Sequence, residues 1–181
     1  MRQRRIFRPA PAPRRWGAFA LGCGLLGAAA LLAVAVPRDL LGSAAPEQRW
    51  SAAAPEVMVL DGDALRLGDR VLRLAGLSVP ARGAARCGAE DCAAAAADAL
   101  AHLVRGRAVD CVLHGRDRHG RALGTCEAGE AGLNQALVEA GWALAEPGAM
   151  ALQPAEAVAR RAGRGLWSTD GPSAESWRNR R

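Results

Sequence analysis

The sequence predicts a mainly β fold with added helices: a five-stranded barrel of the OB type, preceded by one transmembrane helix. The barrel follows from the order of the predicted elements, which is three short strands, a helix, two strands and two more helices. Five short strands with an inserted helix fit a closed barrel, because closure leaves no sheet edge bare. The transmembrane helix follows from a long uncharged run near the N-terminus. A generic α+β sandwich is the alternative fold.

Each element has its own local signal. Turn residues at 61–63 and 68–69 separate short apolar or alternating runs, which is typical of strands joined by hairpins. Apolar positions at helical spacing and an alanine run at 93–97 indicate the first helix, which ends at Gly106. The strands are predicted at residues 57–60, 64–67, 71–74, 107–114 and 121–127, and the helices at 90–105, 133–140 and 154–163.

The N-terminal segment carries the net positive charge of the chain. All 24 basic residues are Arg; six of them precede residue 37, and the 18 that remain balance the 18 acids. Residues 16–36 contain no charge, and a helix of this length spans roughly 30 Å, about the hydrocarbon thickness of a membrane. The Arg-rich flank places the N-terminus in the cytoplasm and the remaining chain outside it. A signal peptide cleaved after Ala33-Val34-Ala35 is the alternative.

These observations predict a single-pass protein of the inner (cytoplasmic) membrane, with a periplasmic or otherwise extracytoplasmic domain. The predicted regions are a basic tail at 1–15, the anchor at 16–36, a linker at 37–54, the folded domain at 55–169 and a tail at 170–181. Because the part after the anchor is neutral overall, its charge gives no support for a basic nucleic-acid-binding surface.

Four of the five cysteines lie in the predicted exported part: Cys87, Cys92, Cys111 and Cys126. An even number outside the cytoplasm favours two disulfides, for which three connectivities exist. Cys111 and Cys126 flank the predicted hairpin symmetrically and are candidates for one pair, which would leave Cys87 and Cys92 to close a short loop. Zinc is the alternative for four cysteines, but the sequence contains no tight C-x-x-C pair.

Three stretches, in this order and at this spacing, resemble the staphylococcal-nuclease-type (thermonuclease) family. They are V-L-D-G-D at 59–63 with R-L-A-G-L-S-V-P-A at 73–81, then G-R-D-R-H-G-R-A-L at 115–123, then L-N-Q-A-L-V-E-A-G-W-A at 133–143 with G-L-W at 165–167. Together they cover roughly residues 56–168. The resemblance implies an OB barrel with added helices, in agreement with the strand order.

The resemblance also implies a site for phosphodiester cleavage with Ca²⁺. In the family two Asp and a carbonyl help to hold the metal, a Glu activates water, and two Arg bind the phosphate. The first metal-ligand Asp falls on Asp63, and the two catalytic arginines fall on Arg73 and Arg121. The carbonyl ligand falls on Val79. This half of the family site is kept.

The other half of the family site is lost. The second metal-ligand Asp is Ser78 and the general-base Glu is Ala81, while His119 replaces the tyrosine of the family's D-R-Y-G-R. At these positions the chain has two Arg and one acid, whereas the family has two Arg and three acids. We therefore expect that the family's cation site has become an anion site. Losing a general base typically costs about 10²–10⁴ in rate, so efficient hydrolysis is not expected.

The predicted function is a membrane-anchored, catalytically impaired nuclease-like module that binds an anionic or nucleic-acid ligand, or a protein partner, without a cofactor. One alternative is an active Ca²⁺-dependent nuclease that recruits a substitute acid from Glu90, Asp91 or Glu146. The other alternative is a purely structural envelope domain. Asp117 is expected to organise a turn, and His119 to lie at an exposed hairpin tip.

Overall fold

The computed structural model describes residues 47–168, so the predicted anchor at 16–36 lies outside the described part. Within residues 47–168 no helix is long and apolar enough to span a bilayer. The described residues belong to one unit that begins at Glu47.

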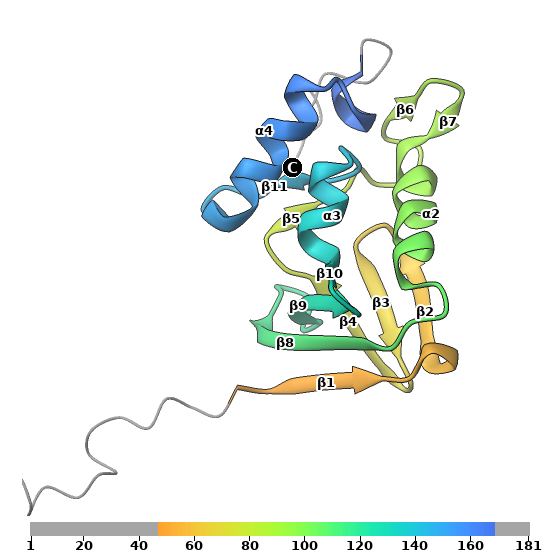
Figure 1. The fold of residues 1–181 in the computed structure, drawn as a ribbon, viewed down its shortest axis with the longest axis vertical. Helices are drawn as coiled ribbons and strands as arrows, with labels where there is room; N and C mark the ends of the chain where they lie inside the picture. Colours follow the sequence, from red (N-terminus) through yellow and green to blue (C-terminus); the bar gives the residue numbers. More distant parts are fainter. Residues whose placement is uncertain (1–46, 169–181) are drawn as a thin grey trace, which may run out of the picture. The chain divides into compact units, whose positions relative to one another are not determined.

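The main sheet of this unit forms a five-stranded barrel in which one of the strands is bent. β1 (Arg49–Ala52) and β2 (Val57–Asp61) are two halves of one bent segment, joined by the short 3-10 helix η2 (Ala54–Glu56). β1 pairs with β8 (Val109–Arg116), whereas β2 pairs with β3 (Ala64–Leu67). The sheet runs on from β3 through β4 (Arg70–Leu74) and β9 (Ala122–Ala128) to β8. The bent segment therefore joins both ends of the sheet, as an OB barrel requires (Figure 1).

The pairing of β4 with β9 is parallel, whereas the other neighbours in this sheet are antiparallel. In this pair Arg73 lies opposite Leu123, and Leu74 lies opposite Gly124. The parallel pair matters for function because it brings the strand that carries Arg73 beside the strand that follows Arg121.

Three α-helices lie where the sequence predicts them: α2 (Cys92–Val104), α3 (Leu133–Glu139) and α4 (Gln153–Arg161). Asp91 caps α2, because its side chain accepts hydrogen bonds from the N–H groups of Ala93 and Ala94. Pro154 stands in the first turn of α4, where its missing N–H costs nothing. In Figure 1, α2 lies alongside β2, and α3 connects the β9 region to the end that carries α4.

Several short elements complete the unit. They are β5 (Leu77–Ser78) paired with β11 (Leu144–Ala145), β6 (Arg86–Cys87) paired with β7 (Glu90–Asp91), β10 (Ala131–Gly132) paired with β9, and the 3-10 helices η3 (Met150–Leu152) and η4 (Gly165–Trp167). The β5–β11 pair is the important one for the site, because Val79 directly follows β5, Glu146 directly follows β11, and both residues line a pocket.

The core is built from leucines rather than aromatics. Leu65, Leu72, Leu100 and Leu137, from two strands and two helices, are fully buried in one cluster. Trp142 packs against this cluster, as expected, and Trp167 packs against a smaller cluster with its ring under the Arg160 guanidinium. Burial of these side chains supplies the main driving force for folding.

Strand β1 lies within the segment expected to be linker. Trp50 packs partly buried against the core, and the guanidinium of Arg70 lies 5.5 Å from the centre of its ring. The hydroxyl of Ser51 donates to Asp110 on β8. The local sequence of β1 carries little strand signal, so its structure depends on these tertiary contacts.

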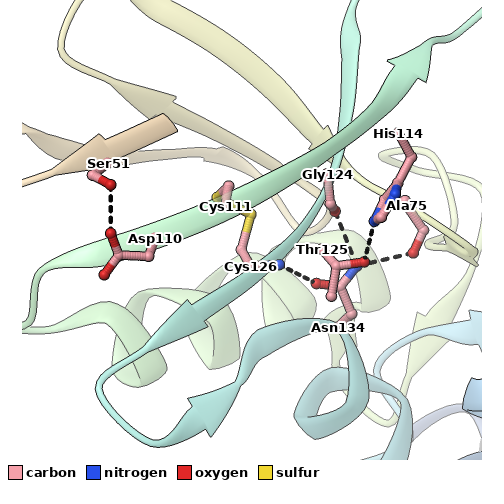
Figure 2. Close-up of a disulfide and its surroundings, with 9 residues drawn as sticks. All are labelled: Ser51, Ala75, Asp110, Cys111, His114, Gly124, Thr125, Cys126 and Asn134. Atoms are coloured by element: carbon pink, nitrogen blue, oxygen red, sulfur yellow. Dashed lines mark hydrogen bonds between the residues drawn. A yellow bond between two sulfur atoms is a disulfide. The ribbon is translucent and has the colours of Figure 1, made fainter. Parts of the chain in front are cut away.

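Both disulfides form between the cysteines of the folded domain. Cys87 pairs with Cys92, and Cys111 pairs with Cys126. Cys111 and Cys126 lie directly opposite each other on β8 and β9, as Figure 2 shows. Of the connectivities left open by the sequence, the structure therefore has the one with the hairpin pair, and the zinc alternative is wrong.

Candidate functional site

The kept family residues meet in a pocket of about 550 Å³. Asp63 comes from the β2–β3 turn, Arg73 from β4, and Arg121 from the end of the β8–β9 hairpin, and all three line the pocket with Ala81. The sequence prediction thus identified three residues that the fold brings together from distant parts of the domain.

Three residues of the pocket lining, Asp61, Arg73 and Leu123, belong to a row that crosses four strands, and we call this row the pocket floor. Asp61 on β2 pairs with Ala64 on β3, Ala64 with Arg73 on β4, and Arg73 with Leu123 on β9. Cross-strand partners point to the same face of a sheet. These four residues therefore share the outer face of the barrel, opposite the inward-pointing Leu65 and Leu72.

Arg73 is held by carboxylates on two sides. Its Nε donates to Asp63 Oδ2 over 2.6 Å, and its Nη2 lies 3.7 Å from Glu146 Oε1. A longer bond, 3.4 Å, runs from Nη2 to the carbonyl oxygen of Leu77. Both Arg73 and Asp63 are largely buried, with side chains 14% exposed. The guanidinium is therefore pre-oriented, yet it has five N–H donors, more than these contacts use.

Arg121 is held by the hairpin that carries it. Its Nε donates to Asp117 Oδ2 over 2.8 Å, and its backbone N–H and that of His119 donate to Asp117 Oδ1. Burial opposes ionisation of Asp117, but these hydrogen bonds and the charge of Arg121 outweigh it and lower the pKa of Asp117 to about 2. Asp117 thus organises the turn, as expected, and orients the arginine as well.

Ala81 and Ser78, which replace two carboxylates of the family, differ in their access to the pocket. Ala81 lines the pocket with a methyl group, so a general base is missing from a wall that ligand can reach. Ser78 is buried at 7% exposure in β5, where it lies opposite Leu144 on β11. Neither side chain supplies a carboxylate.

Two other carboxylates enter the pocket. Asp61 belongs to the floor row, and Glu146 follows β11, where its N–H donates to the carbonyl of Gly76. Of the three substitute acids proposed from the sequence, only Glu146 lines the pocket. Asp91 caps α2, and its pKa is lowered by the N–H of Gly83 and of Ala93 against the effect of burial. Glu90 lies in the β6–β7 hairpin.

The charge balance of the pocket differs from the sequence expectation. Four acids line it, Asp61, Asp63, Asp117 and Glu146, against three arginines, Arg73, Arg118 and Arg121. Arg73, Arg121 and Asp63 still give the family positions their expected surplus of positive charge, but the whole pocket lining has one more acid than arginines. His119 was expected at an exposed tip; it is exposed, but it also lines the pocket, with its Nε2 3.0 Å from Nε of Arg118.

The donors do not assemble the family's calcium site. Hard cations such as Ca²⁺ take six to eight oxygen ligands, and the second Asp and the Glu of the family set are Ser78 and Ala81 here. Asp63 is engaged by Arg73. Within residues 47–168 no three acidic, histidine or cysteine side chains are grouped so that they could hold a metal ion. The residues present thus do not fit the metal as the family binds it.

Comparison with known families agrees with the geometry. The model of the family described as staphylococcal nuclease homologue matches residues 71–169, which is more than half of the chain. The chain belongs to the staphylococcal nuclease homologue family. No curated protein matches the chain. The family match includes Arg73 and Arg121 and starts after Asp63, which the barrel brings to the same pocket.

In this nuclease homologue a buried amide joins β9, the strand that follows Arg121, to the end of β4, the strand that carries Arg73. Asn134, at the start of α3, donates to the carbonyls of Ala75 and Gly124 and accepts the N–H of Cys126 (Figure 2). Ala75 directly follows β4, and Gly124 lies within β9. The sequence motif at 133–143 contains Asn134 but does not predict this role; the only local signal is a polar residue on a helix whose neighbouring positions Leu133, Leu137 and Val138 are apolar.

Proposed function

We propose that the domain binds a phosphate-bearing anion, with single-stranded nucleic acid as the ligand class, and that it cleaves this ligand poorly. The meeting of Arg73 and Arg121 in one pocket, with a methyl group from Ala81 at the general-base position, carries the proposal. A guanidinium presents a planar fork of donors that matches phosphate oxygens. Each arginine is oriented by a carboxylate on its Nε, so its remaining donors are available to a ligand.

The neighbouring carboxylates set the strength of this binding. Glu146 lies 3.7 Å from Arg73 and repels an incoming anion while it attracts the guanidinium. Neutralising it in a Glu146→Gln variant should therefore tighten anion binding. Phosphate binding to the unchanged protein is expected to be weak and to decrease with added salt.

The test uses the full chain in a mild detergent and a fluorescent oligothymidylate, with binding followed by anisotropy in the presence of a chelator. Arg121→Gln should weaken binding about tenfold or more, as expected for a charge-assisted hydrogen bond. Glu127→Gln, an exposed change on β9 outside the pocket lining, is the matched control for Glu146→Gln. Absence of oligonucleotide binding would refute the proposal and favour a structural envelope domain.

Cleavage with Glu146 as a substitute acid is the second candidate function. Its support is that Glu146 lines the pocket and approaches the arginine that would bind the phosphate. The same variant separates the two functions. Glu146→Gln should abolish cleavage if this acid activates water, whereas it should strengthen binding if the pocket only holds an anion. Gel assays of single-stranded DNA with Ca²⁺ and with chelator provide the measurement.

We also propose that the domain works outside the cytoplasm, tethered to the inner membrane by residues 16–36. The uncharged run after an Arg-rich flank supports the tether, and two disulfides in the domain support an oxidising compartment. Fractionation of cells, with protease treatment of spheroplasts, should leave the chain in the membrane fraction and the domain accessible. Recovery of the chain in the soluble cytoplasm would refute the tether.

A further inference from the structure

A second row of side chains lies next to the pocket floor on the same face of the sheet. Met58 on β2 pairs with Arg66 on β3, and Arg66 pairs with Val71 on β4. We call these three residues the outer row. Val71 and Arg73 are two residues apart on β4, so they point to the same face, about 7 Å apart along the strand. The outer row is thus continuous with the pocket floor.

The two apolar members of the outer row are open to solvent. Met58 is 49% exposed and Val71 is 40% exposed, and Leu60, at the irregularity in β2, is 40% exposed beside them. These are three of the four large hydrophobic side chains that are exposed in the described part of the chain. Met58 and Leu60 lie on β2 and Val71 on β4, with only β3 between these strands, which distinguishes them from the scattered apolar residues of an ordinary surface.

Arg66 places one cation between Met58 and Val71 in the outer row. Its Nη2 lies 3.0 Å from the sulfur of Met58, and within residues 47–168 it takes part in no ion pair with a carboxylate. Arg73 and Arg121, in contrast, are both ion-paired. An arginine without a carboxylate partner has its full charge available to an anion.

We propose that the outer row is a second subsite, which binds the continuation of a single-stranded nucleic acid whose phosphate lies in the pocket. Arg66 binds a backbone phosphate, and the apolar side chains on either side contact the flat faces of bases. The alternation of anionic and apolar groups in such a strand matches one cation between two apolar residues. This inference rests on the proposed function and specifies its ligand as a polymer rather than a single phosphate group.

The test compares a dinucleotide with a ten-residue oligothymidylate, both labelled, on the full chain with chelator present. Arg66→Gln should weaken the ten-residue strand roughly tenfold and leave the dinucleotide unchanged. It should also lower the slope of log affinity against log salt by about 0.7, the value for one lost phosphate contact with a single strand. Val71→Ser should weaken the longer strand without changing that slope.

Arg105→Gln is the charge-matched control, because Arg105 is exposed just after α2 and belongs to neither row. It should change neither affinity nor slope. If the dinucleotide binds but Arg66→Gln leaves the longer strand unaffected, the second subsite is refuted and the proposed function stands. If Arg66→Gln weakens both lengths equally, the subsite is also refuted. If neither strand binds the unchanged protein, the proposed function fails and this inference fails with it.

Discussion

The Nε of Arg73 donates to Oδ2 of Asp63 over 2.6 Å, joining the β2–β3 turn to β4 in the lining of the pocket. Both side chains are only 14% exposed, so water cannot readily replace the Asp63 carboxylate as the hydrogen-bond acceptor of Arg73. We expect Asp63→Asn to lower the free energy of unfolding by about 2 kcal/mol, because it leaves a largely buried guanidinium with a weaker partner. Urea denaturation provides the measurement.

Asp69→Asn is the control for that change. Asp69 is almost fully exposed and lies 3.8 Å from Arg70, so the loss should stay below about 0.5 kcal/mol. Equal losses in the two variants would show that the Asp63–Arg73 pair adds nothing beyond a surface ion pair.

Asn134 should be among the most sensitive polar positions of the domain. Asn134→Ala removes three hydrogen bonds and leaves the N–H of Cys126 without its acceptor inside the core. We expect a loss of about 3 kcal/mol in the free energy of unfolding. The neighbouring Gln135→Ala, an exposed change in the same helix, should cost less than about 0.5 kcal/mol. A neutral Asn134→Ala would contradict the structural role of the amide.

The two disulfides should differ in their contribution to stability. Cys111–Cys126 closes a sequence separation of 15 and Cys87–Cys92 one of 5, and loop closure is worth more for the longer loop. Replacing both cysteines of a pair by Ala should cost about 3 kcal/mol for the hairpin pair and about 2 kcal/mol for the loop pair. Thermal unfolding of the two double variants, with and without reductant, checks the order. The reverse order would contradict it.

The fold was predictable because its local signals agree with one another. The strands 57–60, 64–67 and 71–74 have Asp-Gly or Gly-Asp turns between them, and these strands appear as β2, β3 and β4. Gly141, expected to end a helix, has φ +80° and approaches the backbone of Arg164 so closely that a Cβ would lie 2.2 Å from its oxygen. Where turn chemistry and periodicity point to the same structure, sequence alone suffices.

The site was predictable only in part. Asp63, Arg73 and Arg121 followed from the family motifs, because those motifs fix residues relative to strands. Glu146 was one of three candidates, and only the pairing of β5 with β11 brings it to Arg73. The sequence predicts Asp61 in a turn, whereas it ends β2, and the irregularity in that strand places it in the pocket floor. Contacts between distant segments decide such positions, and a local pattern does not contain them.

Acid should weaken the hairpin that carries Arg121. The pKa of Asp117 is about 2 in the folded protein, below the ordinary value of 3.8, so between these values the unfolded chain binds more protons than the folded one. The stabilisation from ionised Asp117 is therefore complete above about pH 4 and is lost as the pH falls towards 2. Urea denaturation at pH 5, 4, 3 and 2 should show a gap between the unchanged protein and Asp117→Asn that closes with acid. Arg121→Gln removes one of the interactions that lower the pKa of Asp117. In an Arg121→Gln background, the gap caused by Asp117→Asn should therefore close over a narrower pH range. A gap that stays constant down to pH 2 would show that Asp117 does not hold the arginine as a carboxylate.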